Sequence, residues 1–246
     1  MPLRTITPQA TNRFCCLIIG RAGMGKTCLL RTIMGQEYDQ ISRAWKQAQE
    51  PKEKVLTLSA ESGLLCVRDL VEQKMLEGYE IGSLQDLREA QIMLMTPEFR
   101  DRYGWVFIDS LTEISSRCVE AMRIRYPSGS DTYKMWGEYN DAMTLLIKAF
   151  RDMSDYNVVF TCLESVDIDE NKRRFLAPAI SGSQLKERLT SYFDEVFHMT
   201  ETASEDGFVW RVFHTAHPVG LAKDRSGRLS PVESPNLLHI KNKILG

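Results

Sequence analysis

Continuous apolar segments alternate with segments of helical periodicity along most of this chain. The apolar segments predict buried strands, and they lie at residues 14–19, 55–59, 79–82, 105–109 and 157–163. Helices are predicted between them, at 83–95 and 132–153 among other places. The first opens with Ser83 and Asp86 in the arrangement of a capping box. This alternation predicts βαβ units, and therefore an α/β fold with a mostly parallel sheet covered by helices on both faces.

Two more apolar stretches, at 194–199 and 208–215, follow near the C-terminus and are separated by the polar sequence TETASEDG. This pattern is typical of a hairpin, so we expect antiparallel strands at one edge of the sheet. Neither an internal repeat nor a low-complexity linker interrupts the chain. We therefore expect a single domain over residues 1–246, with an N-terminal extension at 1–12 and a C-terminal tail at 240–246.

Composition narrows the functional classes. The 246 residues are 43% hydrophobic and 26% charged, which is typical of a globular domain with a substantial core. The net charge of −2 excludes a generally basic nucleic-acid binder, so any such contact needs a local patch. We expect no signal peptide and no membrane span, because long apolar runs are absent. Six cysteines without a C-x-x-C pair favour reduced thiols and a cytosolic compartment.

The sequence GRAGMGKT matches the phosphate-binding loop pattern G-x-x-x-x-G-K-[ST] and joins a predicted strand to a predicted helix. Glycines allow main-chain N–H groups to surround a phosphate, the lysine adds a positive charge, and the threonine hydroxyl ligates Mg²⁺. The pattern predicts that ATP and Mg²⁺ are bound by residues Gly20, Arg21, Ala22, Gly23, Met24, Gly25, Lys26, Thr27 and Cys28.

Asp109 is the second candidate ligand. It ends the apolar segment WVFID, which places its carboxylate at the carboxyl end of a buried strand, where open α/β sheets bind ligands. We expect Asp109 to hold Mg²⁺ through water, as a metal site shared with Thr27. An ordinary strand-end aspartate is the alternative.

The segments LSAESGLL and FIDSLTEIS resemble the RecA group of ATPases, in which the second core strand ends in an acidic pair. The resemblance implies that Glu61 is the carboxylate that polarises the attacking water, a role within reach of a strand-end residue across from the loop. A helix N-terminal acid is the alternative for Glu61. Arg68, in the following helix, is predicted to cover the adenine.

The segment NVVFTCLESVD, with the sequence that follows it, resembles the corresponding part of replicative helicases of the DnaB kind. In that family a strand ends in a polar sensor, here near Glu164, and a mobile basic loop follows. The resemblance implies that Lys172, Arg173 and Arg174 face DNA. A second candidate DNA segment, residues 123–139, mixes cations with aromatic side chains. For Trp136 and Tyr139 the alternative is the apolar face of their helix.

The segment AKDRSG resembles elements of RadA and DnaB proteins whose lysine and arginine reach the nucleotide of the neighbouring subunit. The nearby sequence offers no dedicated partner for both cations. The resemblance therefore implies that Lys223 and Arg225 act in trans and neutralise charge that develops on the γ-phosphate. A solvated surface turn is the alternative.

Together these motifs, in this order, resemble a phage-encoded family of RecA-fold ATPases that includes single-strand annealing recombinases. The resemblance implies ATP hydrolysis, head-to-tail self-assembly into a ring or filament, and a location in the bacterial host cytoplasm. It also implies single-stranded DNA and a single-strand-binding protein as partners. Two other functions stay open: a nucleotide-dependent assembly or switch factor that binds a protein, and a small-molecule kinase.

Overall fold

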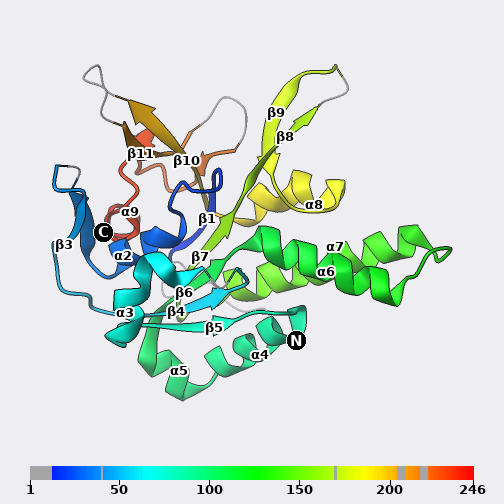
Figure 1. Cartoon of the computed structure of the whole chain (residues 1–246), viewed down its shortest axis with the longest axis horizontal. Coiled ribbons are helices and arrows are strands. Elements are labelled where there is room, and N and C mark those ends of the chain that lie inside the picture. The colour runs from blue at the N-terminus through cyan, green and yellow to red at the C-terminus, as the bar shows by residue number, and fades with distance from the viewer. Residues whose placement is uncertain (1–12, 40, 62, 169–170, 204–208, 217–220) are drawn as a thin grey trace, which may run out of the picture.

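The computed structural model describes the chain except for residues 1–12, 40, 62, 169–170, 204–208 and 217–220. The predicted N-terminal extension and the first residue of the predicted 208–215 strand therefore lie outside the described residues. A central sheet runs in the order β13-β11-β10-β1-β7-β6-β4-β5, and β12 pairs with β10 (Figure 1). In that order these strands are Val232–Glu233, Val209–His214, Glu195–Ala203, Cys15–Ile19, Asn157–Cys162, Tyr103–Asp109, Lys54–Ser59 and Leu76–Glu80, and β12 is Lys223–Asp224.

The six strands from β10 to β5 are all parallel, and β11, β12 and β13 add antiparallel pairs at the other side. This confirms the predicted fold class. The carboxyl ends of β1, β4, β6 and β7 meet at one edge, which we call the carboxyl edge. The strand predicted at 79–82 instead forms β5 three residues earlier, because its pairing with β4 starts at Leu76 opposite Val55.

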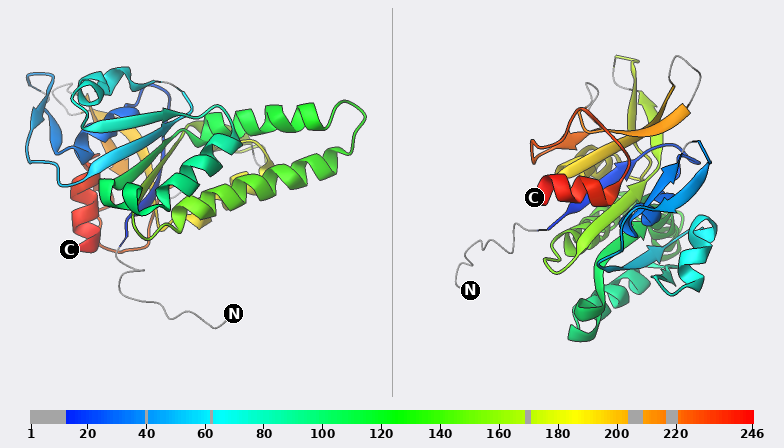
Figure 2. Two further views of the ribbon diagram at one scale, coloured as in Figure 1. Left: turned by 90° about the horizontal axis from the view of Figure 1, so that it is seen from below. Right: turned by 90° about the vertical axis from the view of Figure 1, so that its left-hand side faces the viewer.

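Helices cover both faces of the sheet (Figure 2). Side chains that alternate along the strands point into two separate hydrophobic clusters, one on each face. The first face carries α4 (Leu84–Leu94), α5 (Pro97–Arg102), α6 (Leu111–Arg125), α7 (Thr132–Arg151) and α8 (Ser183–Arg188). The second carries the short helices η1 (Thr27–Leu29), α2 (Leu30–Ile33), η2 (Leu64–Val67) and α3 (Arg68–Glu72), together with α9 (Leu237–Leu245).

The long helices follow their sequence signals. Ser83 caps α4 in a capping box with Asp86, as predicted. The predicted apolar face of α7 is buried, and α6 and α7 project together beyond the sheet as an antiparallel helical pair (Figures 1 and 2). Among the described residues, no helix combines the length and the apolar character needed to cross a membrane.

Residues 240–246, predicted as a C-terminal tail, lie in α9 up to Leu245. Asn236 caps α9, which runs to Leu245, and both Leu237 and Ile240 are buried against the sheet. The apolar residues of LLHIKNKIL form one narrow stripe along the helix. That stripe is enough to bury two side chains, because the core against which it packs is formed by other elements.

Two hairpins lie outside the central sheet. The first, β2 (Gln36–Asp39) with β3 (Ala44–Gln47), follows the phosphate-loop helix. The second, β8 (Glu164–Ile168) with β9 (Arg174–Pro178), extends from the carboxyl edge after β7 (Figure 1). The basic segment predicted as a mobile loop is therefore the end of a two-stranded hairpin.

Candidate nucleotide-binding site

The loop that follows β1 has the shape that its glycines permit. Gly23 and Gly25 adopt φ angles of 79° and 87°, a left-handed region that other residues rarely enter. At Gly20 the main-chain N–H donates to the carbonyl of Cys162 at 3.2 Å, and an added Cβ would lie 2.7 Å from the carbonyl oxygen of Met199. The loop is thus a close-fitting main-chain cradle at the carboxyl edge, which fits a phosphate group.

Lys26 lies inside this cradle. Its side chain is 7% exposed, and Nζ donates to the carbonyl oxygens of Gly20 and Arg21, both at 2.8 Å. Burial lowers the pKa of Lys26, and the charge of Asp109 opposes that shift. The ammonium is therefore held over the loop by main-chain acceptors, with Asp109 as a nearby counter-charge.

Thr27 and Asp109 form the candidate metal site. The Thr27 hydroxyl donates to Oδ2 of Asp109 at 2.6 Å, and Thr161 from β7 donates to the other carboxylate oxygen. Burial raises the pKa of Asp109, and these two hydrogen bonds oppose the shift. A hydroxyl and a carboxylate oxygen this close are the donors that Mg²⁺ prefers, so the residues present fit a magnesium ion held by Thr27 and Asp109.

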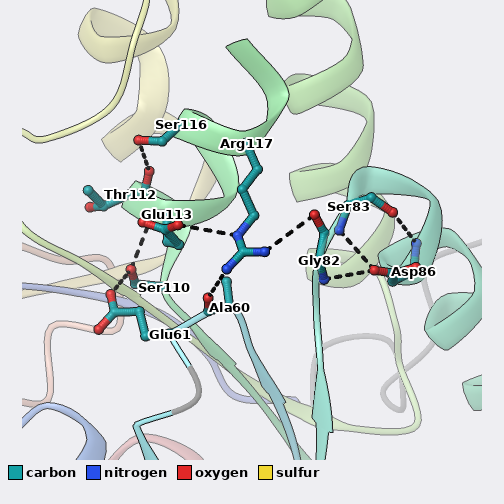
Figure 3. Close-up of polar contacts among 10 residues, drawn as sticks. All are labelled: Ala60, Glu61, Gly82, Ser83, Asp86, Ser110, Thr112, Glu113, Ser116 and Arg117. Carbon is teal, nitrogen blue, oxygen red and sulfur yellow. Dashed lines mark hydrogen bonds and ion pairs between the residues drawn. The ribbon is translucent and has the colours of Figure 1, made fainter. Parts of the chain in front are cut away.

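Glu61 reaches the same edge from the end of β4. Its carboxylate accepts a hydrogen bond from the Ser110 hydroxyl, which directly follows Asp109 (Figure 3). Arg117 on α6 fixes the surrounding backbone, because its guanidinium donates to the carbonyl of Ala60 at 2.7 Å and to that of Gly82 at 3.4 Å. Glu61 is exposed. Its alternative role as a helix N-terminal acid is not favoured by geometry, since η2 begins three residues later with Gly63 as its N-cap.

Glu164 connects the loop to the start of the β8–β9 hairpin. Its carboxylate accepts from Nε of Arg21 at 2.8 Å and contacts Nε2 of His198 at 2.7 Å. Burial opposes ionisation of Glu164, but the hydrogen bonds from His198 and Arg21 outweigh it and lower the pKa. A residue of the phosphate loop is thereby linked through one carboxylate to the hairpin.

A family model described as an AAA domain matches residues 12–226. The chain belongs to the AAA domain family. Among curated proteins, no match to the chain was found. An AAA-type domain is a P-loop ATPase, so this AAA domain binds nucleotide, and the cradle at residues 20–27 is the part of the structure with the shape for it.

The fold does not place Arg68 beside the phosphate loop. Its guanidinium donates to Glu72 at 2.7 Å within α3, and the side chain is largely exposed. It is not among the described residues that line the cavity beside the phosphate loop. Covering of adenine by Arg68 therefore stays a prediction without support from the geometry.

Lys223 and Arg225, which were predicted to reach the nucleotide of a neighbouring subunit, lie at the edge of the sheet opposite the carboxyl edge. Asp224 in β12 pairs with Glu195 at the start of β10, and Glu195 lies beside Cys16 of β1. Lys223 pairs with Val196, which lies beside Leu17 of β1, and the phosphate loop begins three residues after Leu17, at Gly20, or about 10 Å farther at ~3.3 Å per residue. Lys223 and Arg225 therefore do not reach the phosphate loop of their own chain.

Each of these two cations has a partner that is distant in the sequence, 33 and 31 positions away, and that the nearby sequence therefore did not reveal. Lys223 donates to the carbonyl of Thr190 at 3.0 Å, and Arg225 pairs with Asp194 at 2.5 Å. Asp224 organises the turn by accepting from the main chain of Gly227 and Leu229. Burial lowers the pKa of Lys223, and the neighbouring charge of Arg225 adds to that effect.

Both candidate DNA segments carry exposed cations, but in the second segment two of the aromatic side chains pack into the core. Lys172, Arg173 and Arg174 are all exposed at the end of the β8–β9 hairpin. In the other segment Tyr139 is fully buried, and its hydroxyl donates to the carbonyl of Ser181 at 2.9 Å. Trp136 packs edge-on against Tyr139 with ring centroids 5.5 Å apart. The helix-face alternative therefore holds for Tyr139, and Trp136 packs against the same core.

Several residues of the site were missed, among them Thr161, Ser110 and, at the phosphate loop, Arg211. Arg211, in β11, donates to the carbonyl of Gly23 at 3.4 Å, so that its guanidinium lies at the phosphate loop. In the sequence it is a single cation between Trp210 and Val212, and no motif surrounds it. Only the antiparallel pairing of β10 with β11, in which Arg211 lies opposite Glu201, brings it to the loop.

Proposed function

We propose that this AAA domain is a RecA-fold ATPase of phage type that acts as a head-to-tail oligomer in single-stranded DNA annealing or homologous recombination. One observation carries the proposal. The phosphate loop and the basic pair Lys223 and Arg225 lie at opposite edges of one sheet. A site that needs both features can be completed only by a second copy of the chain.

In the proposed assembly, the carboxyl edge of one subunit faces the opposite edge of the next. Lys26 holds the β- and γ-phosphates, while Thr27 and Asp109 hold Mg²⁺, which screens phosphate charge. Glu61 orients the attacking water from the end of β4. Lys223 and Arg225 of the neighbour neutralise the charge that develops on the γ-phosphate, and hydrolysis thus depends on assembly.

The hairpin supports a role with DNA. Lys172, Arg173 and Arg174 are three consecutive exposed cations on a segment that leaves the carboxyl edge. The net charge of the whole chain is −2, so binding of a phosphate backbone requires a local cluster of cations. These three residues form such a cluster. Glu164, at the base of the hairpin, contacts Arg21 of the phosphate loop, which gives a route by which bound nucleotide and DNA influence each other.

The test of shared sites is a mixing experiment. The variant Lys26→Ala removes the loop cation, and the double variant Lys223→Ala/Arg225→Ala removes the basic pair. Each alone is expected to be nearly inactive in ATP hydrolysis, and an equimolar mixture is expected to regain activity, because some interfaces combine an intact loop with an intact pair. A triple variant carrying all three changes, mixed with either, is the control and should restore less. No recovery in the mixture, or full activity of the double variant alone, contradicts the proposal.

Binding of single-stranded DNA is tested by its salt dependence. Replacing Lys172, Arg173 and Arg174 with alanine should reduce the slope of log K against log salt by about two, since each contact in a single strand contributes ~0.7. The control replaces three exposed cations on other elements, Lys46 in β3, Arg88 in α4 and Lys148 in α7. An equal slope for the triplet variant and the parent protein removes the hairpin from the DNA contact.

A second candidate function, a nucleotide-dependent assembly factor that binds a protein, is favoured by a specific feature of the same hairpin. Val166 and Ile168 in β8 are 60% and 65% exposed, beside the cations. Apolar side chains on a projecting strand suit a protein surface better than a phosphate backbone. ATP turnover stimulated by single-stranded DNA supports the first function. Turnover that responds only to self-association, with no DNA retained on a column, supports the second.

A further inference from the structure

Arg211 occupies an unusual place for a surface strand residue. Besides its contact with the Gly23 carbonyl, Nη1 lies 2.8 Å from the point where a Cβ on Gly25 would be. Its ion pair with Glu201 is long, at 4.0 Å, and the side chain is 44% exposed. The guanidinium therefore lies against Gly23 and Gly25 of the phosphate loop, and its contacts with the described residues are long.

A cavity of about 1050 Å³ begins at this point. Gly25 and Cys28 form its end at the phosphate loop, Trp45 comes from the β2–β3 hairpin, and Arg211 comes from β11. The cavity is large enough for a nucleotide, and polar side chains line it from several elements, among them Arg211 in β11, Glu37 in β2 and His239 in α9. Arg211 thus contacts the phosphate loop and also lines this cavity.

We propose that Arg211 binds the nucleotide phosphates from within the same chain, as a ligand separate from the basic pair contributed in trans. The inference rests on the proposed function, because it requires a nucleotide at the loop. A guanidinium offers several donors in a rigid plane and binds phosphate oxygens in pairs. Among the described residues, the Arg211 guanidinium donates to a neutral carbonyl at 3.4 Å, and a phosphate oxygen within its reach would be a stronger acceptor.

The β10–β11 pairing explains why this cation is fixed in place. Glu201 and Arg211 are opposite residues in the antiparallel register, while Phe197 and Phe213, farther along the same strands, stack at 5.0 Å in the core. β11 is therefore held in the core at Phe213, and Arg211 extends from the same strand. A ligand on a rigid strand needs little reorganisation when the nucleotide binds.

A purely structural role is the competing explanation, in which Arg211 only braces the loop through the Gly23 carbonyl. The two roles differ in their response to salt and to the chemistry of the ligand. A direct contact with phosphate is ionic and is screened as salt increases. A brace acts through a hydrogen bond to a neutral acceptor, so its contribution to affinity should be nearly constant with salt.

The experiment measures binding of MgATP and of inorganic tripolyphosphate by calorimetry at about 50 mM and about 500 mM salt. The variants are Arg211→Gln and Arg211→Lys. Arg100→Ala is the matched control, because Arg100 also donates to a main-chain carbonyl, pairs with a carboxylate at 3.4 Å and is 45% exposed. In Arg211→Gln, the loss of a charged hydrogen bond should weaken the binding of both ligands roughly 10- to 100-fold at low salt. Arg211→Lys should recover part of the loss, and the control should change less than about twofold.

Three outcomes overturn the inference. An unchanged affinity in Arg211→Gln removes the contact altogether. A loss for MgATP without a loss for tripolyphosphate assigns the residue to the base or ribose. A loss that is the same at both salt concentrations identifies a brace. Failure of the proposed function would look different: the parent protein would bind no MgATP, or Lys26→Ala would bind it as well as the parent does.

Discussion

Glu195 provides the sharpest test of the electrostatics around the β12 turn. It is 3% exposed at the start of β10 and accepts a hydrogen bond from the Ser226 main chain at 3.1 Å. Burial raises the pKa of Glu195 to about 8, and the negative charges of Asp224 and Asp194 add to the shift. The carboxyl group is therefore protonated in the folded protein at pH 7, whereas it is ionised in the unfolded chain.

The magnitude follows from proton linkage. The pKa of Glu195 is higher in the folded protein than in the unfolded chain. The stabilisation that protonation of Glu195 provides is therefore complete below about pH 4.5 and is lost as pH increases through about 8. The full shift is equivalent to roughly 5 kcal/mol at ~1.4 kcal/mol per unit. Because relaxation and water penetration reduce the penalty of burial, and because the charge of the partly exposed Asp224 is screened, we expect less than half of this, about 2 kcal/mol.

The assay is urea unfolding followed by tryptophan fluorescence at pH 5, 6, 7 and 8 at constant ionic strength. The free energy of unfolding of the parent protein should fall by about 2 kcal/mol between pH 5 and pH 8. Glu195→Gln cannot ionise, so it should match the parent near pH 5 and exceed it at pH 8. Glu120→Gln, on the exposed side of α6, is the control and should follow the parent. Identical pH slopes for the parent and Glu195→Gln would refute the reasoning.

Three further predictions concern single side chains. Tyr139→Phe removes a buried hydroxyl that bridges a serine hydroxyl and a main-chain carbonyl, and should lower the free energy of unfolding by about 1–2 kcal/mol in urea titrations. Gly20→Ala forces a Cβ to 2.7 Å from the carbonyl of Met199 and should cost about 1–3 kcal/mol and weaken MgATP binding; an unchanged melting temperature contradicts this. A hydrogen bond from the neighbouring Cys66 thiol lowers the pKa of Cys28 to about 7, whereas burial raises the pKa of Cys15 to about 12. Cys28 should therefore be alkylated by iodoacetamide at pH 7 well before Cys15, and mass spectrometry of the peptides decides the order.

The sequence predicted the parts of the site that depend on local chemistry. Gly20, Lys26 and Thr27 stand at fixed spacings because one short loop must surround one phosphate. Asp109 was found because a continuous apolar strand ended in a carboxylate, and the structure brings it to 2.6 Å from Thr27. The parallel sheet and the capped helix α4 were also predictable, because each is encoded by a repeating pattern within one segment.

Features that depend on pairing between distant segments were not predictable in this way. Arg211 reaches the phosphate loop only through the register of β10 and β11. The partner of Arg225 is Asp194, which is 31 positions away and belongs to the turn before another strand. Helix α9 was missed because its burial depends on a core made by other elements, and a nine-residue segment gives little periodicity of its own.

The placement of the loop and the basic pair at opposite edges has a consequence for counting. In an open row of n head-to-tail copies, one terminal subunit presents a cradle with no neighbour and the other presents an unused pair, so n − 1 sites are complete. A closed circle of n copies has n complete sites. Turnover per subunit in such a row would increase with its length and level off, whereas a circle would show a single abrupt gain upon closure.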